Sequence, residues 1–560
     1  MNQQSTGHCQ TSASLFQIES LPFSDIPHQS KLFLEYQKNP GALRQFYPSA
    51  PETHAEISRS IQRVLANYKT DRSALCSRLA ETNKNFGAAR ETLENINLLR
   101  ESDSVAVVTG QQAGLFSGAV YTIYKALSAV KMAACLRGRG IKAVPVFWIA
   151  EEDHDFDEVK KTFVLDGEGK LAALENTPQN YTENSPVGSV KLDQTIKQTI
   201  DEFFDYARYT EFSDDLRQIL TASYNGNETY SSAFAKFLTK IFAPYGLIIF
   251  SPLDKGLKAL SAPIFSEAVK KSDEIRRELL ARNAELTAQG YDAQVLVEED
   301  FFPFFWIDET GARRALKRQR DGKIRAKDTR REFDLAELME IAAEQPENLS
   351  PNALMRPVVQ DYLLPTAVYF GGGAEIAYFA QNSTVYEVLQ RPATPILHRQ
   401  SFTVIEARHR RTLRKYDLSF TDLFDGFESI LPGIVEKYLT PETARVFAEA
   451  EEIINTQLNR LDQTLALSEP GLAENLARRR RKILYHIGAL RTKFHYAQIR
   501  RDATVNRRIE TALAALLPHK ALQERTLNVL TFLNAHGLYF IDWIYAAIDL
   551  DDKAHRIIYL

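Results

Sequence analysis

The chain has little of what marks a secreted, zinc-binding or membrane protein. It holds three cysteines in 560 residues, Cys9, Cys76 and Cys135, at no CxxC or Cys/His spacing. This pattern argues against a disulfide framework or a zinc site and favours a reducing compartment. Apolar runs such as VPVFWIA and GLIIF are far too short to span a bilayer, and the first residues lack the order of a secretory signal. We therefore expect a cytoplasmic protein with no membrane partner.

A basic excess is also missing. The 68 Lys and Arg residues are balanced by 72 Asp and Glu residues, for a net charge of −4, which gives no electrostatic case for nucleic-acid binding. Hydrophobic residues make up 44% and charged residues 25% of the chain, as in ordinary soluble enzymes. The length predicts roughly three or four domains, or one core with large insertions.

A parallel sheet is predicted from about residue 105 onward. A β-branched run at 105–108, helical spacing over 120–136 and a buried-type strand at 144–149 form a βαβ unit, with helices expected on both faces of the sheet. Further strands are predicted at 247–250, 367–370 and 395–397, after a mostly helical first hundred residues.

Two stretches look like insertions. Residues 166–230 are polar and rich in turn residues. Later, a helix over 262–289 leads to strand-like runs at 293–297 and 304–307, then to a turn and the basic segment RRALKRQRDGK. Such a basic run is typical of a solvated hairpin face.

The last part of the chain predicts a pair of long helices. After TPET, a good helix start, the spacing of Ile454, Leu458, Leu461 and Leu465 is that of a heptad seam, and SEPG then breaks the helix. A second seam consists of Ile483, Ile487, Leu490, Phe494 and Ala497. The two helices should pack antiparallel as a hairpin, with their remaining apolar surface used in a homodimer or in an intramolecular clamp.

Three predicted strand ends carry unusual chemistry, and ligands of open α/β sheets bind at such ends. The first, AVVTGQQAGLFSG, allows close backbone approach at Gly110 and Gly114, adds the amides of Gln111 and Gln112, and precedes a helix with Lys125. It matches neither GxGxxG nor GxxxxGK[ST]. Two interpretations of this segment are open: it binds a ligand, or it is only a glycine-containing connection between a strand and a helix.

The second strand end, AEEDHDFDEV, gathers six carboxylates around His154. It could cap a helix, bind an ammonium group, supply a general base or hold Mg²⁺, and a buried structural histidine remains an alternative. The third, YFGGGAEIAYFAQ, has three consecutive glycines and places Glu375 and Tyr378 on one helical face. Upstream of it, RPVVQDYLLPT offers Arg356, Gln360 and Asp361.

Several long segments, taken in order, resemble one family. TGQQAGLFSGAVYTIYKA, PVFWIAEEDHDFDEV, RPVVQDYLLPT, GGGAEIAYFAQ and ERTLNVL are similar to BshC, the cysteine-adding enzymes of bacillithiol synthesis. The resemblance departs at GGGAE, where a smaller proline-containing turn is expected, and at Glu151, where a glycine is expected.

The resemblance implies a Rossmann-like core with two connecting insertions, a C-terminal coiled coil, and a homodimer through that coiled coil. It also implies a ligase that joins the carboxyl of cysteine to the amine of glucosaminyl-malate, to make a low-molecular-weight thiol. The expected domains are 1–165 with the N-terminal helices and first core part, insertion 166–230, core 231–269, insertion 270–345, core 346–425, coiled coil 426–520, and a segment 521–560 on the core.

Amide formation from a free carboxylate is uphill in water, so we expect ATP with Mg²⁺ as the activating agent, although no standard ATP motif is present. A nucleotidyltransferase acting on another small acid and a non-catalytic delivery dimer are the alternatives. The candidate catalytic residues are Glu152, Asp153, His154 and Asp155, with the cluster around His154 expected to bind the substrate amine and take its proton. The candidate substrate-binding residues are Thr109, Gly110, Gln111, Gln112, Gly114, Tyr124, Lys125, Gln360, Gly372, Gly373, Glu375, Tyr378 and Gln381, and His398, Arg399 and Ser401 are candidates for phosphate oxygens.

Overall fold

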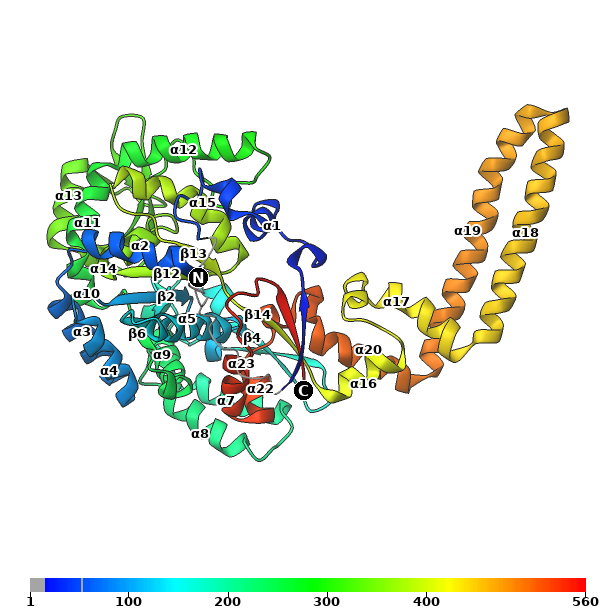
Figure 1. The fold of residues 1–560 in the computed structure, drawn as a ribbon, viewed down its shortest axis with the longest axis horizontal. Coiled ribbons are helices and arrows are strands. Elements are labelled where there is room, and N and C mark those ends of the chain that lie inside the picture. Colours follow the sequence, from blue (N-terminus) through cyan, green and yellow to red (C-terminus); the bar gives the residue numbers. More distant parts are fainter. Residues whose placement is uncertain (1–15, 52–53) are drawn as a thin grey trace, which may run out of the picture. The chain divides into compact units, whose positions relative to one another are not determined.

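The structure is a computed structural model that describes residues 16–51 and 54–560. The described chain forms two compact units (Figure 1). The first, called the core unit, comprises the described residues up to 167 together with 172–403 and 524–558. The second, called the helical unit, comprises 168–171, 404–523 and 559–560.

A five-stranded parallel sheet forms the centre of the core unit, in the order β13-β12-β2-β3-β6. Every residue of β3 and β12 is buried, so both faces of the sheet are covered, as is usual for parallel sheets. The predicted βαβ unit is confirmed as β2, α5 (Tyr121–Gly138) and β3. The strands are β2 (Val105–Gln111), β3 (Ala143–Ile149), β6 (Ile248–Phe250), β12 (Thr366–Gly371) and β13 (Ile396–His398).

One face of this sheet is closed by α5 and by α2 (His54–Asn67). Ile57 and Ile61 of α2 and Met132 and Leu136 of α5 pack in one buried cluster with Val105 and Val107 of β2 and with residues of β12. Because side chains alternate across a strand, Val105 and Val107 share one face of the sheet. The apolar cluster fixes the direction in which α5 leaves the end of β2.

The strand order creates a switch point between β2 and β12. From β2 the chain passes through α5 to β3 on one side, whereas from β12 it passes through α15 (Gly373–Val388) to β13 on the other. The two connections therefore diverge from neighbouring strands, which leaves a crevice at the carboxyl ends, the usual ligand site of an open α/β sheet.

The first insertion has more regular structure than its polar composition predicts. It contains β5 (Leu171–Glu175), which pairs with β4 (Lys161–Leu165), followed by α7 (Thr195–Tyr206) and α8 (Ser213–Ser223). The chain returns to β6 through α9 (Tyr230–Ile241).

The second insertion differs from its prediction in two places. The single helix expected over 262–289 is two helices, α11 (Ala262–Lys270) and α12 (Ser272–Ala288). The strand expected over 293–297 does not form, because the Gln381 side chain bonds both the N–H and the C=O of Val295. An antiparallel sheet follows, in the order β10-β9-β8-β7-β11, made of Glu332–Phe333, Ile324–Ala326, Arg313–Arg318, Phe304–Ile307 and Leu349–Pro351.

The other elements of the core unit are short or peripheral. The three-stranded sheet β1-β15-β14 includes the two strands, β14 and β15, in which the chain passes between the units. The strands of this sheet are β1 (Gln17–Leu21), β14 (Ser401–Ile405) and β15 (His555–Tyr559). The helices not yet described are α1 (Lys31–Lys38), α3 (Arg72–Asn85), α4 (Arg90–Leu99), α6 (Phe156–Val159), α10 (Lys255–Leu260), α13 (Leu335–Glu344), α14 (Arg356–Leu363), α21 (Gln523–Thr526), α22 (Leu530–His536) and α23 (Tyr539–Ala547).

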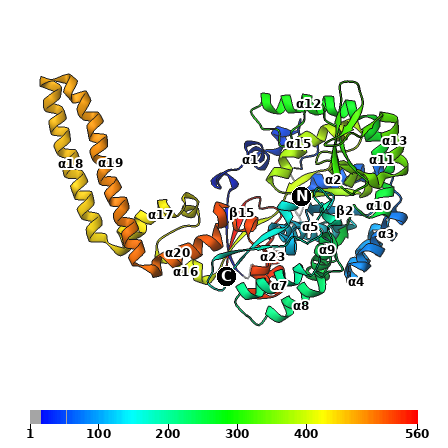
Figure 2. The ribbon, with the colours of Figure 1, turned by 180° about the vertical axis from the view of Figure 1, so that it is seen from behind.

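The helical unit contains the predicted hairpin. α18 (Pro441–Ser468) and α19 (Pro470–Arg501) lie side by side and antiparallel (Figures 1 and 2). The unit begins at Val404, earlier than the predicted boundary at 426, so that α16 (Ala407–Lys415) belongs to it and not to the core. It also contains α17 (Phe427–Ile434) and α20 (Ala503–Leu516).

The predicted seam of α19 is partly wrong. Ile483 and Leu490 are 40% and 60% exposed, whereas Arg480 and Arg491 lie at the contact with α18. Arg480 donates to Asn455 and Asn459 at 2.8 and 2.7 Å, and Arg491 pairs with Glu451 of α18. Polar residues therefore take inner positions that an apolar pattern cannot identify.

The remaining expectations concern cysteines and membranes. Cys76 is a buried free thiol, and Cys9 lies outside the described residues. Within residues 16–51 and 54–560, none of the helices has the length and apolarity needed to cross a bilayer.

Candidate functional site

The turns that follow β2 and β12 face each other at the switch point. Gly110 is required there because a Cβ atom would lie 2.6 Å from the carbonyl oxygen of Trp148. At Gly371 a Cβ atom would lie 2.9 Å from the Cβ of Glu375. Gly114 has a different role: a Cβ there would meet Gly118 at 2.9 Å, so its glycine serves the turn itself.

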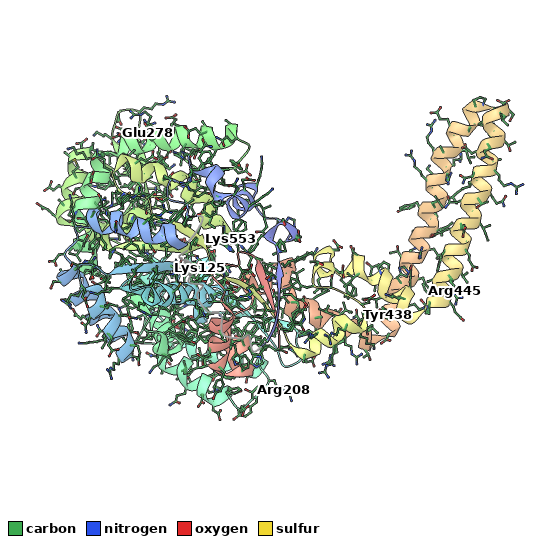
Figure 3. The ribbon with its side chains drawn as sticks, in the orientation of Figure 1. Lys125, Arg208, Glu278, Tyr438, Arg445 and Lys553 are labelled. Carbon is green, nitrogen blue, oxygen red and sulfur yellow. The ribbon has the colours of Figure 1, made fainter. Side chains whose placement is uncertain are left out.

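Lys125 of α5 joins the two turns. Its Nζ donates to the Gly110 carbonyl at 2.8 Å and to Gln111 Oε1 at 2.9 Å, and it forms an ion pair with Glu375 of α15. The lysine side chain is 2% exposed and lies in the interior of the core unit, whereas Glu278 lies on its surface (Figure 3). The buried Lys125 ammonium therefore contacts groups on both the β2 side and the β12 side of the crevice.

Glu375 is held as a carboxylate by several donors. The Gly372 N–H donates to its Oε2 at 2.7 Å and the Tyr369 hydroxyl to its Oε1 at 2.7 Å. Burial acts to raise the pKa of this carboxyl, but Lys125 and the two donors together lower the pKa below its usual value. Burial lowers the pKa of the Lys125 ammonium, and Glu375 opposes that shift.

The two glutamines of the first turn are bound to protein groups. Gln111 accepts from Lys125 and donates to the Tyr121 hydroxyl at 2.9 Å. Gln112 donates to Asp153 Oδ2 at 2.8 Å and to Glu158 Oε2 at 3.0 Å. Gln112 thus holds two carboxylates side by side at the rim of the crevice.

Some carboxylates of the acidic segment after β3 are bonded within the protein interior, and others line the crevice. Glu151 is buried, accepts from Ser231, Ser251 and the Leu253 N–H, and has a pKa that burial raises. Glu152 pairs with the buried Lys258.

Asp155 caps the short helix α6, accepting the Glu158 N–H at 3.2 Å. Asp153 and Glu158 line the crevice, and Glu158 makes no ion pair with any residue in the described part of the chain.

His154 lies beside Arg313, the first residue of β8. Arg313 Nη1 is 3.2 Å from His154 Nδ1 and 3.5 Å from Asp153 Oδ1. Burial and the Arg313 cation lower the pKa of the His154 imidazole, against the pull of Asp153 and Asp155. Arg313 is only 8% exposed, so the expectation of a solvated basic face over this segment is wrong at that residue.

These groups line one cavity of about 700 Å³ in the core unit. Of the predicted site residues, those that line it are Gly110, Gln111, Gln112, Lys125, Glu152, Asp153, His154, Gly372, Gly373, Glu375, Tyr378 and Arg399. Arg356, offered by the segment upstream of the third strand end, also lines the cavity. The sequence did not identify an aromatic wall and three further cations, which are Trp148, Phe301, Phe302, Phe304, Phe305, Arg313, Lys317 and Arg525. Trp148 belongs to β3, Phe304 and Phe305 belong to β7, and Phe301 and Phe302 come from the irregular segment before β7.

Most cations of the cavity already have a carboxylate partner. Arg399 pairs with the buried Glu524 at 2.7 Å, and Lys317 pairs with Asp300 at 2.7 Å. Arg356 and Arg525 differ, because neither makes an ion pair with any residue in the described part of the chain. A ligand with negative charge would complete the charge balance here.

Arg356 is fixed in place by a buried network. Its Nη1 donates to Gln360 Oε1 at 3.0 Å, and the Gln360 amide nitrogen donates to Asp361 at 3.0 Å. Asp361 in turn accepts from Tyr386 and Thr394. The orientation of the Gln360 amide, and with it the position of the Arg356 guanidinium, is therefore set by Asp361.

Gln360 is thus a positioning residue that does not line the cavity, and seven other predicted residues also lie outside it. Thr109 ties β2 to β12 through a 2.8 Å bond to the Phe370 carbonyl, and Tyr124 packs edge-on to Phe402. His398 lies between Phe23 and Phe33. The remaining four also bond or pack within the protein: Asp155 caps α6, Gly114 serves the turn at Gly118, Gln381 bonds the Val295 segment, and Ser401 donates to the Glu524 carboxylate.

A metal site is not apparent in the acidic segment. Among the described residues, no three His, Cys, Asp or Glu side chains converge in a way that could hold a metal ion.

Comparison with known proteins decides the family. The family model described as Bacillithiol biosynthesis BshC, N-terminal Rossmann-like domain, matches residues 16–400, and the one described as Bacillithiol biosynthesis BshC, C-terminal coiled-coil domain, matches residues 402–560. The chain belongs to the BshC family.

Relatives in the BshC family cover nearly the whole chain. A protein of Koribacter versatilis named "Putative cysteine ligase BshC" is 35% identical over 96% of this chain and 99% of its own. One of the same name from Solibacter usitatus is 34% identical over 95% and 98%. A solved structure from Campylobacter jejuni, titled as a putative arginyl-tRNA synthetase, covers 86% of this chain and 99% of its own at 10% identity and a TM-score of 0.24, which supports no conclusion.

Replacing Lys125 by Met tests the ion pair at the switch point. At pH 7 we expect the free energy of unfolding to fall by about 3–5 kcal/mol, because Glu375 would remain as an unpaired buried charge. In the wild type the pKa of Glu375 is lowered, so its stabilising effect is present above the unfolded pKa and is lost as pH falls through the folded value. In the variant that pKa would be raised, so the deficit should shrink toward pH 4.

Urea unfolding followed by tryptophan fluorescence at both pH values measures this difference. The exposed Lys142, which pairs at the surface with Glu101 and Asp103, provides the control, and Lys142→Met should cost at most about 1 kcal/mol. A deficit of the Lys125 variant that is equal at pH 7 and pH 4 would contradict the ion pair.

Proposed function

We propose that this protein is a ligase that joins the carboxyl of cysteine to the amine of glucosaminyl-malate. Its family and the names of its relatives support a cysteine ligase of bacillithiol synthesis. The observation that carries the proposal is the charge pattern of the cavity, in which Arg356 has no carboxylate partner and Glu158 has no cationic partner among the described residues. The substrate has the complementary pattern, with carboxylates at one end and an amine at the other.

The Arg356 side of the cavity suits the malate carboxylates. A guanidinium bonds a carboxylate through two parallel N–H groups, and the network of Gln360 and Asp361 holds it ready. The Gly372 and Gly373 turn beside it lines the same cavity and permits close approach of an anion.

The Asp153 and Glu158 side suits the amine. These carboxylates, held together by Gln112, would bind the ammonium form of the substrate. The amine must lose a proton to become a nucleophile, and a carboxylate of this pair is placed to take it.

Activation of cysteine requires a further reactant, and we propose ATP with Mg²⁺. An oxygen of the cysteine carboxylate would attack the γ-phosphorus of ATP and release ADP, giving an acyl phosphate, or attack the α-phosphorus and release pyrophosphate, giving an adenylate. The amine nitrogen then attacks the carbonyl carbon, the bond from that carbon to the phosphate oxygen breaks, and phosphate or AMP leaves as the amide forms. Arg525, which lines the cavity without an ion pair to the described residues, suits the phosphate groups.

Mass spectrometry of the purified protein with cysteine and glucosaminyl-malate tests this function. We expect the amide product only when both ATP and Mg²⁺ are present, together with either ADP or AMP. Pyrophosphate release that does not depend on cysteine would instead indicate a nucleotidyltransferase. Substrate binding without any turnover would indicate a delivery protein.

Arg356→Met tests the carboxylate subsite. We expect the KM for glucosaminyl-malate to rise about 10- to 100-fold, which corresponds to about 1.5–3 kcal/mol for a charged hydrogen bond, with little change in the KM for cysteine. Arg90, an exposed arginine bonded to Glu94, gives the control variant Arg90→Met. An unchanged KM for glucosaminyl-malate would rule out this subsite.

We further propose that two copies associate through the helical hairpin. Large apolar side chains of both helices are exposed, namely Val446, Ile453, Leu461 and Leu467 on α18 and Leu472, Ile483, Tyr485 and Leu490 on α19. An apolar surface of this kind on a long hairpin is typical of a protein interface.

Replacing Ile483 and Leu490 by Glu should then give a monomer, because it places charges in the interface. Analytical ultracentrifugation of the wild type and the double variant measures the mass of each, and the exposed Arg478 of the same helix provides the control Arg478→Glu. A wild type that sediments as a monomer would contradict the association.

A further inference from the structure

We infer that His154 is a hydrogen-bond donor to a substrate oxygen, acting through its Nε2–H, and that Arg313 is the positioning residue that fixes it in this role. The sequence suggested the opposite use, in which the cluster around His154 takes a proton from the substrate amine. The identity of the substrate oxygen rests on the proposed function, but the state of the imidazole does not.

The contact between the two side chains sets the direction of their hydrogen bond. Arg313 Nη1 lies 3.2 Å from His154 Nδ1. A guanidinium has donors only and keeps its proton at any ordinary pH, so Nδ1 must be the acceptor. A neutral imidazole that accepts at Nδ1 carries its hydrogen on Nε2.

The Arg313 guanidinium is held in place by other protein groups. Its Nε donates to Ser350 Oγ at 3.0 Å and its Nη2 to the Pro351 carbonyl at 3.1 Å. The guanidinium also stacks on Phe305 at 3.7 Å from the ring centre. With all three nitrogens engaged by the protein, Arg313 is left to orient His154 and not to bind a ligand.

The imidazole of His154 is partly exposed at the cavity. His154 lines the cavity and its side chain is 33% exposed. No hydrogen bond joins Nε2 to any residue in the described ranges, so this nitrogen is available to a ligand.

The carbonyl oxygen of activated cysteine gains negative charge when the amine attacks the carbonyl carbon. A fixed N–H donor aimed at such an oxygen stabilises the transition state, and the loss of one such donor typically costs about 10²- to 10³-fold in rate. The amine proton then passes to Asp153 or Glu158, so the reaction does not require His154 as the base.

Amide substitutions at position 154 separate a donor from a base. The side-chain nitrogen of glutamine reaches about as far as Nε2 of histidine, whereas that of asparagine reaches about as far as Nδ1. We expect His154→Gln to keep kcat within about tenfold of the wild type, and His154→Asn and His154→Ala to lose about 100-fold or more. Equal losses in all three, with unchanged thermal melting, would overturn the donor role.

Nitrogen NMR of the full-length protein with ¹⁵N-labelled histidine tests the state of the ring without any turnover. The His154 signals, assigned by their absence in His154→Gln, should show hydrogen on Nε2 and a bare Nδ1. Arg313→Met should change this pattern, whereas Arg314→Met should not, because Arg314 bonds Asp308 instead.

The two experiments have separate outcomes. Hydrogen on Nδ1 in the wild type would overturn the inference even if the ligase assay succeeds. Hydrogen on Nε2 in a protein that makes no amide would overturn the proposed function and keep His154 as a donor for another ligand.

Discussion

The ion pair between Lys125 and Glu375 is the interaction on which the rest of the site depends. Two charges removed from water are costly, and their attraction compensates only when the remaining donors and acceptors are also satisfied. Here the Gly110 carbonyl, Gln111, the Gly372 N–H and the Tyr369 hydroxyl do this. These contacts hold the ends of β2 and β12 at a set separation, and every other lining residue is placed relative to them.

A division of labour among charged residues follows from this frame. Charges bonded to other protein groups shape the cavity, as Arg399 does with Glu524 and Arg313 does with His154. We propose that charges that lack such a partner among the described residues, above all Arg356, bind the substrate. Because buried charges are stable only when they are balanced, the charge pattern of the cavity would then be complementary to that of its ligand.

The sequence allowed the parallel sheet to be predicted, because β-branched runs and helical spacing are local signals. Of the residues that it singled out, Lys125, Asp153, His154 and Glu375 line one cavity, and their roles there stay predictions. Arg313 could not be separated from its basic neighbours, because only the tertiary contacts with Ser350 and Phe305 bury it. Ile483 and Leu490 were assigned to the wrong face of α19, since Arg480 and Arg491 take inner positions by bonding side chains of α18.

Glu524 shows what it means for a site to be assembled from distant parts of a chain. It lies more than a hundred residues beyond Arg399, after the whole coiled-coil hairpin, yet it is 1% exposed and balances that arginine within the core unit. During synthesis on the ribosome, Arg399 therefore emerges long before its counter-charge does. The core unit cannot reach its final form until the hairpin has been translated, so a prematurely terminated product cannot form the complete cavity.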